Sequence, residues 1–423
     1  MLARRGLCLG CVTVLLVAVV AIALFVRWWT APIDLPRPQR PPEPADNPYD
    51  VYRSLAIYTA QAFQSDYMLA YAERELSPSR MQMQLHHPEL ARYLLRKMTP
   101  VRLEYRRYLR QPCMVIMEYT PDWRFSELAE FRRWAVVEAI DISLAAQEGD
   151  YARAVDNYQT ILLLSEQIRQ QGAALHYIVG AAMQSIVTIQ MARILSQLPA
   201  PECERLVQVV REWQKHRVPP TQAVAVERDA YLSLLHDLHE GKPEALRIVA
   251  EERSIARWYP RWLNLRRAAQ EGDAYYRQMQ EEIAKPRNAQ RKLPQPQHLV
   301  AQRWGVTDLH TLSRLSAHAT GRVLMLGCAA GVRAYRLRHG AYPPSLSAAG
   351  VEDLNRDPFT GEQFLYKPAA NGFLLYSVGR DGVDDGGKRA PEQQDERGDV
   401  ALLPFYRRHP YADTTLGDPF WLK

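Results

Sequence analysis

The feature that most constrains this chain is an apolar run near its start. Residues 7–26 contain no charged side chain. A helix rises about 1.5 Å per residue, so a run of this length matches a hydrocarbon core of roughly 30 Å. Arg27, Trp28 and Trp29 follow, and such a triplet is typical of a membrane interface, where indole rings prefer the headgroups. We predict a cytoplasmic stub and transmembrane helix over 1–29.

The basic residues Arg4 and Arg5 favour a cytoplasmic start for this helix, although other arginines follow the run. The expected location is therefore the bacterial cytoplasmic membrane, crossed once, with the bulk of the chain outside. A cleaved signal peptide is the alternative, but Trp-Trp-Thr-Ala-Pro follows the run instead of a small-x-small site. A lipoprotein signal fits less well, because the apolar run comes after Cys11.

Residues 30–48 change composition abruptly. Proline fixes φ and lacks an amide donor, so helix and sheet are both disfavoured here. We predict an extended spacer that lifts the folded part off the bilayer, on the basis of Pro32, Pro36, Pro38, Pro41, Pro42, Pro44 and Pro48.

Residues 49–305 have a helical pattern, with apolar residues recurring at intervals of three and four. We predict a mainly α fold with an antiparallel multi-helix domain in this range, for which a solenoid-like stack is one arrangement. One helix is expected over 125–148, capped by Ser126 and ended by Gly149. The basic, proline-interrupted stretch 284–296 looks like a connection.

The junction at 149–161 resembles the second half of a tetratricopeptide repeat. Glycine there permits a tight turn and a small alanine lets two helices approach, as at Gly149, Ala154, Tyr158 and Ile161. No second copy follows at a 34-residue period, so an ordinary helix hairpin explains the pattern equally well.

Charge and cysteine content exclude some classes of function. The chain carries 53 Lys+Arg against 47 Asp+Glu, interleaved along the helices, so no basic patch for nucleic acid is expected. The five cysteines follow no zinc spacing. His236 and His239 share a helix face and, with a carboxylate, would be needed by a metal-dependent hydrolase. Such a pair is more often solvated surface.

Residues 306–423 are expected to form a small α+β module. Its amphipathic helix stops at Gly340 and is defined by Leu312, Leu315, Ala319, Val323, Leu326, Ala330, Ala334 and Leu337. A turn-rich stretch, 357–361, comes next. Two strands, around 364–366 and over 373–377, form a hairpin that reverses at Asn371-Gly372.

Several short motifs of this module agree in order and spacing with one family. They are Ala334-Tyr335, His339-Gly340, Tyr342-Pro343, Ser345-Leu346, Asp357-Pro358-Phe359, Gly361, Phe364, Tyr366, Tyr376-Ser377-Val378-Gly379, Asp381-Gly382 and Asp384-Asp385-Gly386-Gly387. With them, the last hundred residues resemble the C-terminal part of the type II secretion system major pseudopilin. In that family the loop after the last long strand binds calcium.

The resemblance implies a calcium site in the acidic, glycine-rich loop. Ca²⁺ takes six to eight oxygen ligands from a flexible loop. The implied donors are the carboxylates of Asp381, Asp384, Asp385 and Asp399, and the carbonyl of Val378. Lys388, Arg389 and Arg397 lie where the family tends to be acidic.

The N-terminus departs from the pseudopilin pattern. Arg5-Gly6-Leu7 lacks the Phe-Thr and the glutamate of the processing motif, so cleavage and pseudopilus assembly are doubtful. The leading hypothesis is a membrane-anchored extracytoplasmic interaction or scaffold protein, held in the bilayer by residues 7–26 and bound to an unidentified protein partner. The alternatives are a metal-dependent hydrolase and a diverged component of a type II secretion-like system.

Overall fold

The computed structural model describes residues 2–29, 31–76, 86–119, 125–249, 263–305, 308–388, 397–403 and 422. The chain is mainly helical, as predicted. Its helices are α1 (Leu2–Trp29), α2 (Pro48–Ser65), α3 (Tyr67–Glu75), α4 (Pro88–Arg106), α5 (Glu127–Glu148), α6 (Tyr151–Gln167), α7 (Ala174–Ile194), α8 (Ala200–His216), α9 (Pro220–Glu240), α10 (Pro243–Val249), α11 (Leu265–Ile283), α12 (Leu299–Trp304) and α13 (Leu309–His339).

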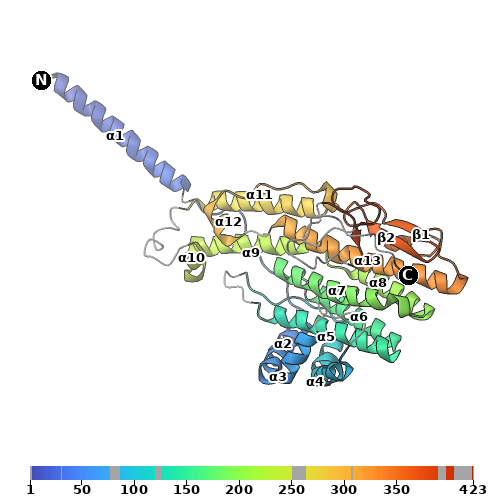
Figure 1. Ribbon diagram of the computed structural model, residues 1–423. Helices are drawn as coiled ribbons and strands as arrows, with labels where there is room; N and C mark the ends of the chain where they lie inside the picture. Colours follow the sequence, from blue (N-terminus) through green and yellow to red (C-terminus); the bar gives the residue numbers. More distant parts are fainter. Residues whose placement is uncertain are drawn as a thin grey trace.

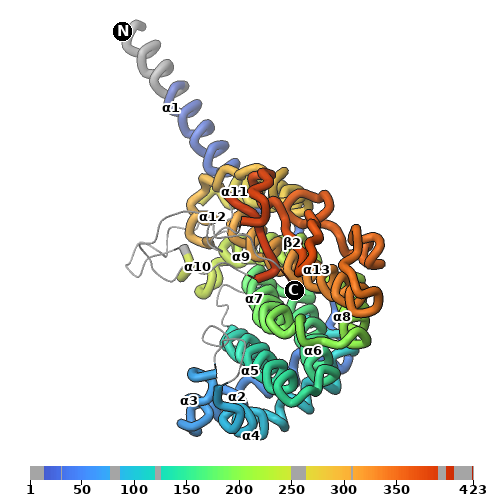
Figure 2. Tube along the Cα trace, turned by 45° about the vertical axis from the view of Figure 1, so that its right-hand side comes forward, coloured from blue at the N-terminus to red at the C-terminus, as the bar shows by residue number. Residues whose placement is uncertain are grey.

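The first helix, α1, stands apart from a helical body (Figure 1). Its 28 residues correspond to a length of roughly 42 Å. The body has α2, α3 and α4 at one end and α11 and α12 at the other, where α1 joins it (Figures 1 and 2). Among the described residues, one helical stretch is long and apolar enough to cross a membrane by composition alone, and that is Ala174–Gln197. Most of this stretch is buried, so it is a core helix.

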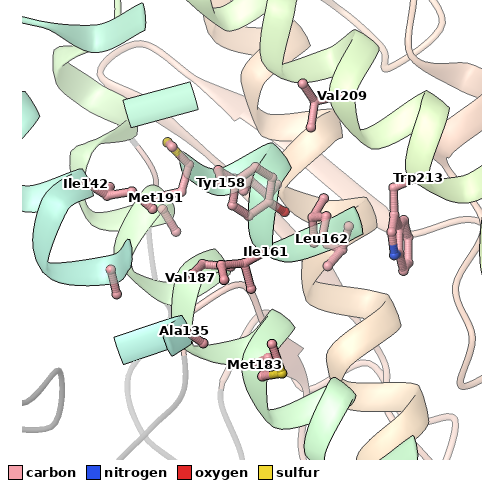
Figure 3. Close-up of a cluster of buried hydrophobic side chains, with 14 of the residues drawn as sticks. Ala135, Ile142, Tyr158, Ile161, Leu162, Met183, Val187, Met191, Val209 and Trp213 are labelled. Carbon is pink, nitrogen blue, oxygen red and sulfur yellow. The ribbon is translucent and has the colours of Figure 1, made fainter. Parts of the chain in front are cut away.

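The centre of the body is formed by α5, α6, α7, α8 and α13, which pack against one another through apolar faces. Figure 3 shows part of this core. Tyr158 and Ile161 of α6 lie beside Met191 and Val187 of α7, and Trp213 comes from α8. A second apolar cluster joins α9, α11 and α12 to the start of α7.

The hairpin predicted at 149–161 is formed by α5 and α6, which pack side by side. Gly149 ends α5 in the left-handed conformation, with φ of 74°. The side chain of Asp150 then accepts a hydrogen bond from the Arg153 amide and begins α6. Ser126 precedes α5 as expected, but its side chain makes no capping hydrogen bond.

Residues 31–47, here called the strap, form neither helix nor strand, as predicted, and they lie along the body. Asp34 accepts hydrogen bonds from Arg266 and Gln270 of α11, and Arg37 forms an ion pair with Asp237 of α9. The strap is therefore docked on the body, because an extended proline-rich segment leaves its charged side chains available to pair with the helices beside it.

The strap continues to the far side of the core. Arg40 donates to the carbonyl oxygens of Val115, at 2.6 Å, and Gln171, at 3.1 Å. Asn47 then exchanges two hydrogen bonds with the backbone of Met114, at 2.8 and 3.0 Å. The strap is thus bound first to the helices α9 and α11 and then to the non-helical backbone at residues 114, 115 and 171.

The two predicted domains, 49–305 and 306–423, pack against each other and share an apolar core. The helix α13 contacts α7 and α8, and its buried apolar residues from Ala317 onward belong to the same core cluster as those of α5 and α6. The stretch 284–296, predicted as a connection, also docks. It contains the short 3-10 turn Arg287–Ala289, where Arg287 and Asn288 donate backbone hydrogen bonds to Pro358 and Phe359.

Among the described residues, the sheet has three strands in the order β1-β2-β3, namely β1 (Leu365–Ala369), β2 (Gly372–Ser377) and β3 (Val400–Ala401). The predicted hairpin is present, with Ala369 opposite Gly372. The turn is thus Ala370-Asn371, one residue earlier than predicted. β3 runs antiparallel to β2, and β2 packs on α13.

Candidate functional site

The candidate site is the acidic loop, which comprises residues 378–388 and 397–399 in the described structure. It leaves the end of β2 and returns into β3. Gly379 has φ of 69°, and a Cβ there would lie 2.8 Å from the carbonyl oxygen of Gly398. Only glycine allows the outgoing and returning chains to approach so closely.

Asp399 is the buried centre of this loop, with none of its surface exposed. Its carboxylate accepts hydrogen bonds from the amides of Gly387, at 2.6 Å, and Asp385, at 3.4 Å. In the part of the chain that the structure describes, no lysine or arginine forms an ion pair with it. Burial raises the pKa of Asp399 to about 7, the two amides oppose this, and the charges of Asp384 and Asp385 add to the rise.

Asp384 faces the sheet more than the centre of the loop. Its carboxylate accepts hydrogen bonds from the Tyr376 hydroxyl and the Gly386 amide, both at 2.8 Å, and lies 3.2 Å from the Lys367 ammonium. Burial alone would raise the pKa of Asp384, but these three donors together lower it. No local sequence pattern predicts this link between β1, β2 and the loop.

Asp381 connects the outgoing and returning parts of the loop. Its carboxylate accepts hydrogen bonds from the amides of Val383, at 3.1 Å, and Gly398, at 3.4 Å. It therefore joins the outgoing chain to the residue before Asp399. Val378, whose carbonyl is the fifth predicted ligand, is half-buried directly after β2.

The predicted donors thus lie in one loop, but their side chains are not gathered as ligands. Within the described ranges, no three His, Cys, Asp or Glu side chains are arranged to hold a metal ion. The donor chemistry nevertheless suits Ca²⁺, because all the groups are oxygens and the buried carboxylate of Asp399 is not neutralised by a described cation. Lys388 and Arg397 are exposed, while Arg389 lies outside the described residues.

A neighbouring turn supports the loop through Asp357, which is buried. Its carboxylate accepts hydrogen bonds from the Phe359 amide, at 2.9 Å, and from the hydroxyls of Thr360, at 3.0 Å, and Ser377, at 2.6 Å. Burial raises the pKa of Asp357. The turn therefore fixes the end of β2, from which the acidic loop starts. Aspartate before Pro-Phe-Thr-Gly is a turn signal that indicates this role.

The helical histidines do not form the alternative metal site. The imidazole Nε2 of His236 lies 3.0 Å from the carbonyl oxygen of Leu35 in the strap. His239 is exposed near the end of α9. Asp237, between them, pairs with Arg37 and with Lys242. This part of α9 holds the strap, so the geometry gives the hydrolase alternative no support.

Comparison of the chain with models of protein families, with curated proteins and with solved structures found no match. The resemblance to the pseudopilin module therefore rests on the motifs alone.

Proposed function

We propose that this protein is a scaffold or interaction protein anchored in the bacterial cytoplasmic membrane by α1, with its body on the extracytoplasmic side. The observation that carries this proposal is the surface of α1. The exposed fractions of its large apolar side chains from Val14 to Trp28 range from 42% to 71%. Such a surface on a protruding helix is costly in water and suited to lipid.

The interaction role is supported by the opposite end of the body. Ile57 and Tyr58 of α2, and Tyr67 and Met68 of α3, have exposed fractions between 46% and 74%. Figures 1 and 2 show α2 and α3 at the end of the body away from α1. Exposed apolar and aromatic side chains are typical of surfaces that bind other proteins. The partner is therefore proposed to dock at this distal end.

The membrane proposal predicts the behaviour of two forms of the chain. The full chain should remain in the membrane pellet after alkaline carbonate extraction, and a chain starting at residue 31 should be released. Alkaline phosphatase fused to the C-terminus should be active, since it folds only outside the cytoplasm.

A photo-crosslinking residue at position 67 should give a protein adduct, and one at Leu337, also exposed but on α13, should not. Release of the full chain would refute the anchor, and equal adducts would refute the distal docking.

We further propose that Ca²⁺ stabilises the acidic loop, held by carboxylates of Asp381, Asp384, Asp385 and Asp399 and the carbonyl of Val378. When bound, the ion supplies the positive charge that Asp399 lacks. The support is the raised pKa of Asp399, which reflects a buried carboxylate close to two others. The same pKa makes the proposal testable without a structure of the bound state.

Without calcium, stability should fall as the pH rises from about 4 to about 7. Asp399 loses its proton near its ordinary value in the unfolded chain but keeps it until about pH 7 in the folded one, so the folded state binds more protons in this window. At pH 8, calcium should raise the melting temperature by a few degrees. Asp399→Asn should remove both the pH dependence in this window and the response to calcium, as measured by thermal melting with calcium and with chelator.

The matched control is Glu362→Gln, which changes an exposed carboxylate of the same module. It should keep both responses. If calcium stabilises Asp399→Asn as strongly as the unaltered chain, the proposed ion site is wrong and the membrane proposal is unaffected.

A further inference from the structure

A cleft of about 560 Å³ opens at the junction of the body and the C-terminal module. Four separate parts of the chain line it: the corner between α8 and α9, the segment after α11, the first half of α13, and the turn that contains Asp357. Its volume lies within the range of small-molecule sites, roughly 300–1,000 Å³. None of the acidic-loop residues lines it.

Rigid apolar groups form much of the wall. Pro219 and Pro220 come from the α8–α9 corner, Pro286 follows α11, and Pro358 belongs to the turn. Proline has a fixed φ, so these segments keep their shape. The turn is also seated closely on α13, because a Cβ at Gly321 would lie 3.3 Å from the Pro358 ring. The cleft is therefore largely preformed.

The charge of the lining is strongly one-sided. Arg217, Lys285, Arg287 and Arg356 line the cleft, and Asp357 is the only carboxylate among the described lining residues. The Asp357 carboxylate is already satisfied by its own turn and by Ser377. Lys285 lies 2.6 Å from Glu282, which does not line the cleft. An excess of positive charge therefore faces the space.

Two of these cations are available to a ligand. Arg217 lies over the ring of Trp213, 5.9 Å from its centroid, and donates to the Thr320 hydroxyl at 3.2 Å. No carboxylate of a described residue pairs with it. Arg356 is exposed, and no described side chain forms an ion pair with it. Guanidinium groups bind phosphate and carboxylate through parallel N–H···O bonds.

We propose that this cleft binds a small organic anion, with Arg217 and Arg356 binding its phosphate or carboxylate group and the proline-lined wall contacting its apolar part. This binding function is separate from the membrane anchor and from the calcium proposal. The cleft depends on the contact between the helical body and the C-terminal module, since each part contributes some of its lining.

The test is isothermal titration calorimetry of the full chain in a neutral detergent, with phenyl phosphate as the probe. We expect one site per chain. Inorganic phosphate should bind more weakly, because it lacks the apolar part, and the neutral compound phenyl glucoside should not bind. Arg217→Gln combined with Arg356→Gln should weaken phenyl phosphate binding by at least about tenfold, since charge-assisted hydrogen bonds are lost.

Arg356→Glu is a second variant, chosen because an exposed side chain without a described ion pair can be changed without unfolding the protein. It should also weaken binding at least about tenfold, through charge repulsion. The control is Arg96→Gln on the exposed face of α4, away from the cleft, which should bind as the unaltered chain does. Absence of binding, equal binding of phenyl glucoside, or unchanged affinity in Arg356→Glu would overturn the proposal.

Discussion

Replacing Glu138 with glutamine is expected to destabilise the body by about 3–5 kcal/mol. The change removes the negative partner of a buried ion pair and leaves the positive partners in place. Glu138 lies on α5 with none of its surface exposed. Its carboxylate accepts two hydrogen bonds from Arg102, at 2.9 and 2.7 Å, and one from Arg106, at 2.9 Å, both on α4. Tyr105, on the same helix, donates a fourth hydrogen bond. The variant would leave Arg102 with Asp141 as its remaining carboxylate partner, and Arg106 with the amide oxygen of Asn157.

The pKa of Glu138 supports this expectation. Burial alone would raise it, but Arg102 and Arg106 outweigh burial and hold it at about 2. The charged form is therefore favoured in the folded state. This contribution to stability is present above the ordinary pKa of glutamate and is lost as the pH falls toward 2.

Urea unfolding followed by circular dichroism would measure the effect. Glu148→Gln is the matched control, since Glu148 pairs with Arg92 and Arg153 at the surface end of the same helix. Exposed pairs contribute about 0–1 kcal/mol, so the control should change stability little. Similar losses in the two variants would contradict the special role of the buried pair.

The second large effect is expected for Gly272→Ala in α11. Alanine normally stabilises a helix by about 1 kcal/mol relative to glycine. Here a Cβ would lie 2.1 Å from the ring of Tyr231 on α9. That ring is fully buried and its hydroxyl donates to the Ala268 carbonyl at 3.1 Å, so it cannot move without loss of the hydrogen bond. We expect a net loss of about 2–3 kcal/mol.

Gly321→Ala in α13 provides the comparison, because its nearest neighbour would be 3.3 Å away. It should change the free energy of unfolding by less than about 1 kcal/mol. If both variants were equally stable, the close approach of α9 and α11 at Gly272 would not be a constraint on the fold.

The helices were predictable because their signals are local. Apolar spacing and the glycine at 149 are enough to define α5 and α6. The strap could not be predicted in the same way, since prolines indicate extended backbone but not what it lies against. Its partners, such as Asp237 for Arg37, lie 200 residues away in the sequence. The same limit applies to the stretch 284–296, whose prolines and basic residues predict a connection but not the turn on which it docks.

The candidate site could be predicted only as a loop. Its glycines and aspartates indicate a turn-rich acidic segment, which is what the structure contains. The direction of each carboxylate depends on contacts from elsewhere, as when Tyr376 and Lys367 turn Asp384 toward the sheet. The cleft was not predicted at all, because its lining comes from four segments that meet only in the folded chain.

If α1 spans a bilayer, as proposed, the strap limits how freely the body can move relative to that bilayer. A long flexible linker would let the body take many orientations and positions above the bilayer. Here Ala31 bonds back to Trp28 at 3.4 Å, and the following residues are fastened to α9, α11 and the 113–115 loop. On the proposed anchoring, the link left free between α1 and the body is therefore short, and the tips of α2 and α3 would stay within a narrow range of heights over the bilayer.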